Sequence, residues 1–146
     1  AQIASIEHLI SYADLSNEKV SQKGIDWHLD HTLKVIIQVS QILTKSDPKR
    51  YKWRPNIGRF LIINMGIFPR GRAKAPKSVN NKAPIDVDDL WLQLEEVKKE
   101  LRDLDKLPAK AYFKHPYLGR LDLRASKRFL TVHTRHHLKI IQDILK

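Results

Sequence analysis

The chain has no cysteine, no long apolar run and almost no acidic residues in one long stretch. Without cysteine, disulfides, thiolate nucleophiles and cysteine-rich zinc sites are excluded. The longest apolar stretch, residues 60–68, is interrupted by Asn64 and is too short to cross a bilayer. The first residues show no basic region followed by an apolar one, so no secretory signal is expected. We therefore expect a soluble, cytoplasmic protein without a membrane partner.

Acidic residues are nearly missing from residues 45–82, which hold eleven Lys and Arg and one acid, Asp47. The rest of the chain carries 16 basic and 15 acidic residues, so this region holds almost all of the net charge of +11. Its prolines and its low apolar content after Phe68 predict a long loop. Such loops are usually either functional or mobile.

Apolar residues recur at helical spacing in five segments, and no alternating strand pattern is found. The length of 146 residues suits one domain covering residues 1–146. We expect helices at residues 2–13, 25–44, 56–66, 87–106 and 123–145, with Asp86 and Asp122 at two N-termini. The predicted inner face of the third helix is Ile57, Phe60, Leu61, Asn64 and Met65. Residues 107–119 are expected to be irregular, so the predicted fold class is an all-α bundle.

Three of the seven histidines, His133, His136 and His137, fall within five residues of the last predicted helix. His133 and His137 are four residues apart and share a helix face, and two neutral imidazoles at this spacing can chelate one divalent cation. A third ligand should come from a facing helix, as bundles place metal sites in their core. The second predicted helix offers His28 and His31, and periodicity does not choose between them. In the alternative interpretation these histidines are hydrogen-bonded core residues.

Three short stretches resemble the DinB/YfiT-like superfamily of metal-dependent four-helix-bundle proteins. They are residues 27–33 (Trp-His-Leu-Asp-His-Thr-Leu), 115–121 (His-Pro-Tyr-Leu-Gly-Arg-Leu) and 133–137 (His-Thr-Arg-His-His). The resemblance implies an up-down four-helix bundle with an additional short helix and long connecting loops. It also implies that His31, His133 and His137 hold a metal. His28 and His136 then become neighbours of the site, on the outer side of the ligands or facing the substrate.

The family activities that the resemblance implies are thiol-dependent transfer or isomerisation and metal-assisted hydrolysis. The implied cofactors are a divalent metal, with zinc or nickel foremost, and a low-molecular-weight thiol. An open metal position would lower the pKa of a bound water or thiol. No carboxylate stands out as a general base, since Asp30 points away from His31 on the helix and Asp143 is expected in solvent. His115 either reaches the site from its loop or anchors that loop by hydrogen bonds.

The basic region has a functional interpretation of its own. Arg70, Arg72, Lys74 and Lys77 would bind an anionic small-molecule substrate or cofactor near the mouth of the bundle. The alternative function is a non-catalytic basic module, with a vestigial metal site, that binds an anionic ligand or nucleic acid. Tyr51 and Trp53 lie among basic residues and suit base stacking, but no nucleic-acid-binding motif accompanies them. Nucleic acid therefore ranks below a small molecule as the partner, and the sequence leaves a homodimer open.

Overall fold

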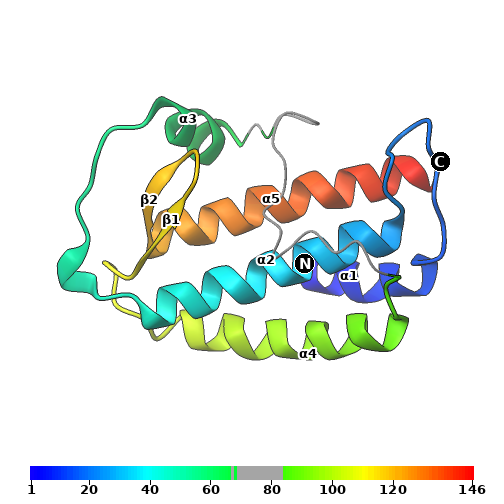
Figure 1. Ribbon diagram of the computed structural model, residues 1–146, viewed down its shortest axis with the longest axis horizontal. Coiled ribbons are helices and arrows are strands. Elements are labelled where there is room, and N and C mark those ends of the chain that lie inside the picture. The colour runs from blue at the N-terminus through cyan, green and yellow to red at the C-terminus, as the bar shows by residue number, and fades with distance from the viewer. Residues whose placement is uncertain (67, 69–83) are drawn as a thin grey trace.

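The computed structural model describes residues 1–66, 68 and 84–146 (Figure 1). These residues are mostly helical, with one small two-stranded sheet, so the prediction of a purely α-helical fold was too strict. None of the helices in these ranges combines the length and the apolar character needed to cross a bilayer. Four cations predicted to bind an anion lie outside the described residues: Arg70, Arg72, Lys74 and Lys77.

Four helices pack around the core: α1 (Gln2–Leu9), α2 (Ile25–Lys45), α4 (Val87–Leu104) and α5 (Leu123–Ile144). α2 contacts α4 and α5, and α1 contacts the same two helices (Figure 1). A short 3-10 turn, Ile10–Tyr12, extends α1. The predicted caps are present, because Asp86 accepts a hydrogen bond from the backbone N–H of Asp88 and Asp122 accepts one from that of Ala125.

α2 is the most buried helix and determines where the candidate site lies. Most of its residues are buried, on several faces, because α4 covers one side and α5 covers another. Towards α4, the buried carboxylate of Asp30 accepts hydrogen bonds from Lys34 (2.8 Å) and Gln93 (2.9 Å). Asp30 therefore faces α4, whereas the histidines of α2 lie on the side towards α5.

The third predicted helix is present, but its predicted inner face was wrong. The chain forms one short α-helical turn, α3 (Ile57–Arg59), followed by a π-helical turn, η3 (Phe60–Asn64). Ile57 is 81% exposed and Phe60 60%, whereas Ile62 and Ile63 pack against the core. A π-helix has more residues per turn than the 3.6 assumed in the prediction. The apolar face is therefore displaced from the positions expected for a regular helix.

The segment predicted to be irregular forms a β-hairpin of β1 (Tyr112–His115) and β2 (Gly119–Asp122). The antiparallel register pairs Phe113 with Leu121, and both side chains are buried. Gly119 has a φ of 70°, a conformation that glycine adopts without strain. Each strand has only four residues, and one buried residue per strand gives too little alternation for the pattern to be seen in the sequence.

Candidate metal centre

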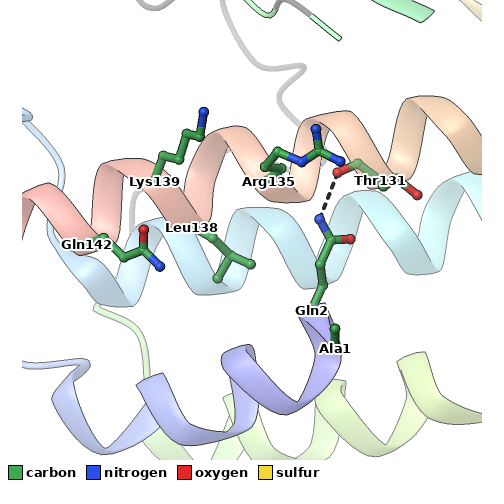
Figure 2. Close-up of a pocket in the computed structure, with 7 residues that line it drawn as sticks. All are labelled: Ala1, Gln2, Thr131, Arg135, Leu138, Lys139 and Gln142. Carbon is green, nitrogen blue, oxygen red and sulfur yellow. Dashed lines mark hydrogen bonds between the residues drawn. The ribbon is translucent and has the colours of Figure 1, made fainter.

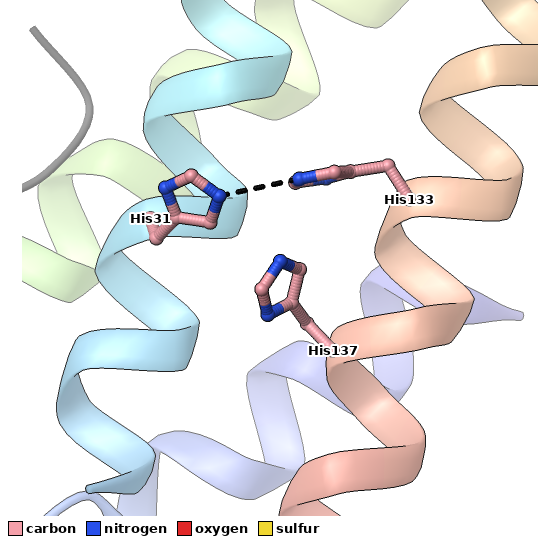
Figure 3. Close-up of side chains that lie close together, drawn as sticks. All are labelled: His31, His133 and His137. Atoms are coloured by element: carbon pink, nitrogen blue, oxygen red, sulfur yellow. Dashed lines mark hydrogen bonds between the residues drawn. The ribbon is translucent and has the colours of Figure 1, made fainter. Parts of the chain in front are cut away.

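Three buried histidines from two helices meet between α2 and α5. α2 supplies His31, and successive turns of α5 supply His133 and His137 (Figure 3). One ligating atom from each ring lies within 4.8 Å of the others. The Nε2 atoms of His31 and His133 are 3.2 Å apart and share a hydrogen bond. The structure therefore brings together the i,i+4 pair predicted on the last helix, and His31 from the second.

The distances suit a small divalent cation. Two nitrogens bound to zinc at about 2.05 Å with tetrahedral angles lie roughly 3.3 Å apart. The 3.2 Å between Nε2 of His31 and Nε2 of His133 is close to this value. The ligating nitrogen of His137 lies within 4.8 Å of both, so the three nitrogens are close enough to hold one ion. Three histidine nitrogens and no carboxylate form a donor set that borderline-soft ions such as zinc and nickel accept.

Burial keeps the ligand pair neutral. It lowers the pKa of His133 well below the ordinary value, and the nearby His31 lowers it further. The pKa of His137 is also strongly lowered, first by burial and then by His133. A protonated imidazole has no lone pair to offer a metal, whereas a neutral one has. Both α5 histidines are therefore in the ligating charge state at neutral pH.

A chain of hydrogen bonds runs outward from His137. Its Nδ1 lies 2.9 Å from Nδ1 of His28, and Nε2 of His28 lies 3.0 Å from the hydroxyl of Ser21. Ser21 also accepts a hydrogen bond from the backbone N–H of Lys23 (3.1 Å). Since Nδ1 of His137 is engaged with His28, Nε2 is the nitrogen directed towards His31 and His133 (Figure 3). His28 thus lies directly behind a ligand of the three-histidine set.

No protein-family model, curated protein or solved structure matches the chain. The DinB/YfiT-like resemblance therefore stays a prediction carried by three short stretches of sequence. The case for a metal centre depends on the geometry and surroundings of these histidines.

Aromatic rings enclose the three-histidine set. Trp27 stacks on His31 with centroids 4.8 Å apart and planes 7° from parallel. Phe129 lies 5.6 Å from the ring of His133, and Phe68 meets the same ring edge-on at 5.7 Å. Such packing restricts rotation of the imidazoles and keeps water from their faces.

The remaining predicted site histidines lie at the margins. His136 is half-buried beside Phe68 (5.0 Å between centroids) and next to His137. His115 lies in the hairpin, where its Nδ1 accepts hydrogen bonds from the backbone N–H groups of Tyr117 (3.1 Å) and Leu118 (3.2 Å). These contacts are the loop-anchoring role that the sequence offered as the alternative to a place in the site.

Two residues of this centre were missed in the sequence. Trp27 lies four positions before His31, so its stacking on that ring could have been inferred from helical spacing. Ser21 lies in the loop before α2, and nothing in its local sequence indicated a contact with His28.

A surface depression between the start of α1 and α5 is separate from the centre, since no histidine lines it (Figure 2). Its walls are Ala1, Gln2, Thr131, Arg135, Leu138, Lys139 and Gln142.

Proposed function

We propose that this protein is a divalent-metal-dependent enzyme whose metal is held by His31, His133 and His137. The observation that carries the proposal is the meeting of these three buried imidazoles within 4.8 Å. A hydrophobic core rarely gathers several imidazoles unless they are satisfied by hydrogen bonds or by a ligand. The proposed metal position lies where Nε2 of His31 and Nε2 of His133 face each other at 3.2 Å.

The helix packing supports the fold that the resemblance implies. Each of α1 and α2 contacts both α4 and α5, which is the closed arrangement of a four-helix bundle. In such bundles, side chains from facing helices build the metal site. The proposed ligands come from α2 and α5, two helices in direct contact. This arrangement favours a DinB-like bundle with α3 and the hairpin added at one end.

The donor set favours Lewis-acid chemistry. Three neutral imidazoles leave the full charge of a divalent ion uncompensated, so an anionic fourth ligand is favoured. When bound, zinc or nickel would lower the pKa of a water or a thiol at the open position and make it nucleophilic at neutral pH. The protein's own residues hold the ligands in their neutral form and restrict their orientation. We therefore place the reaction among metal-assisted hydrolyses and thiol-dependent transfers or isomerisations of a small substrate.

The first test is metal content. Protein without a histidine tag would be reconstituted with zinc or nickel, desalted and measured by elemental analysis. We expect close to one equivalent in the wild type and little in His133→Ala or His31→Ala, because each variant loses one of three ligands. The matched control is His8→Ala, an exposed histidine of α1, which should retain the metal.

Circular dichroism would establish that each variant is folded before its metal content is compared. Loaded protein would then be screened with hydrolysable esters and amides, and with low-molecular-weight thiols plus electrophilic acceptors. If the wild type takes up no metal after reconstitution, or if the His8→Ala control loses as much as His133→Ala, the proposed function is wrong. The histidines would then be core residues.

A further inference from the structure

A second surface, outside the three-histidine set, combines exposed aromatic rings with positive charge. The chain following α2 runs beside the hairpin to α3 at one end of the molecule (Figure 1). Four hydrogen bonds join the two segments: Tyr112 N to Ser46 Oγ (3.0 Å), Asn56 Nδ2 to Tyr117 O (3.1 Å), Arg59 Nη1 to Arg120 O (3.0 Å) and Arg120 Nη1 to Arg50 O (3.3 Å). These bonds fix residues 46–59 on the hairpin as one platform.

Aromatic rings on this platform lie against guanidinium groups. Arg59 lies over the ring of Trp53 at 5.3 Å, and Arg120 lies over Tyr112 at 5.6 Å. Tyr51 packs beside Tyr112 with centroids 5.8 Å apart. Despite its contact with Arg59, Trp53 is 66% exposed, so much of the indole is open to a ligand. The cation–π contacts hold the rings in place and set positive charges next to their faces.

The platform and the residues directly around it are predominantly positive. Residues 45–66 and 107–124 together contain ten Lys and Arg and two acids. Both acids have structural partners: Asp47 pairs with Arg50 and accepts from the backbone N–H of Lys49, and Asp122 caps α5. Residues 86–105 of the α4 region, along the lower edge of the molecule in Figure 1, carry eight acids and three basic residues. This asymmetry would turn the platform towards a polyanion.

We propose that this platform binds single-stranded nucleic acid. In residues 49–54 (Lys-Arg-Tyr-Lys-Trp-Arg) aromatic residues alternate with cations, which is the combination that contacts successive bases and phosphates. Trp53 stacks on an unpaired base, and Lys49, Lys52 and Arg54, all exposed, contact the phosphates. A duplex keeps its bases stacked on one another and offers no base face to Trp53. This binding is independent of the proposed metal centre.

The test is fluorescence anisotropy with labelled oligonucleotides of about twenty nucleotides, as RNA, as DNA and as the matching duplex, over a range of salt. Trp53→Ala should weaken binding of the single strand by about tenfold, since one stacked base is lost. The control is Trp91→Ala on α4, a partly exposed tryptophan on the acidic side, which should leave affinity unchanged. Lys52→Ala should reduce the slope of log affinity against log salt concentration by about one, because one phosphate contact is lost. Lys106→Ala should leave this slope unchanged.

Binding of either single strand with these effects, unaltered by a chelator, would support the proposal. Absence of single-strand binding would overturn it, as would equal affinity for the duplex or an equal loss in Trp91→Ala. Vesicles of phosphatidylcholine and phosphatidylserine provide the last comparison. If they displace the oligonucleotide from the wild type but not from Trp53→Ala, the platform is a membrane-binding surface and the proposal is wrong.

Discussion

At the scale of single residues, the hydrogen bonds behind His137 determine where its protons lie. A bond between two imidazole nitrogens needs one N–H and one lone pair. If Nε2 of His137 faces a metal, its Nδ1 carries the proton and donates to Nδ1 of His28. His28 then carries its own proton on Nε2 and donates it to the hydroxyl of Ser21. Each tautomer follows from the one before, so His28 is a positioning residue for His137.

Removing the acceptor behind His137 should weaken metal binding without removing a ligand. We expect His28→Leu to raise the zinc dissociation constant by roughly 10- to 100-fold, the effect usual for a group that orients a metal-bound histidine. His28→Asn retains an acceptor oxygen near the position of Nδ1 and should recover part of the affinity. Competition with a chromophoric chelator measures both constants.

A pair of serine variants tests the outer end of the hydrogen-bonded series from His137 through His28 to Ser21. Ser21→Ala removes the acceptor for His28 and should weaken zinc binding, whereas Ser11→Ala removes a hydroxyl that donates to the backbone carbonyl of His8 in α1 and should not. Equal losses in His28→Leu and His28→Asn would show that His28 acts by packing alone.

At the scale of elements, the hairpin depends on a histidine whose pKa is lowered in the folded state, so that it is neutral there down to about pH 4. Nδ1 of His115 accepts from the N–H groups two and three residues further on, the pattern that Asn or Asp makes in a tight turn. Its ring packs against Phe129 of α5 with centroids 5.0 Å apart. This burial lowers the pKa of His115 from the ordinary 6.5 to about 4.

The lowered pKa predicts acid sensitivity. Between pH 6.5 and about 4 the unfolded state protonates His115 and the folded state does not. The free energy of unfolding should therefore fall as pH falls through this window. His115→Asn keeps the acceptor and does not titrate, so the free energy of unfolding of this variant should fall less steeply as pH falls. Its slope against pH should be smaller than that of the wild type by an amount corresponding to at most one bound proton. Urea unfolding at several pH values measures the slope, and identical slopes in the two proteins would contradict the assignment.

The same element shows where sequence patterns stop being informative. Long helices were predictable because apolar residues repeat many times and because Asp86 and Asp122 mark their starts. The hairpin was not, since its strands are short and its stability comes from contacts with distant residues such as Ser46. The inner face of η3 was misplaced because a π-turn changes the period. Local periodicity carries information only where the element is long and regular.

At the scale of the whole molecule, the candidate site was predictable in part for a similar reason. The i,i+4 spacing of His133 and His137 puts them on one helix face whatever the rest of the fold does. The choice between His28 and His31 depends on the rotation of α2 against α5, which is set by packing over many residues. Both histidines are buried here, so hydrophobic pattern alone could not have separated them.

A metal held by His31, His133 and His137 would tie α2 to α5 and so stabilise the whole fold. At a free metal concentration 100 times the dissociation constant, the stabilisation is about 2.7 kcal/mol. For a chain of this length, that corresponds to a rise in Tm of roughly 5–10 °C. We expect zinc to produce this rise in the wild type and in His8→Ala, a chelator to reverse it, and His31→Ala to show none. Magnesium should have little effect because it prefers oxygen ligands. The variant His31→Ala has lost the ligand that α2 contributes to the proposed site. A similar rise in Tm in this variant would therefore show that the ion stabilises the protein at another site.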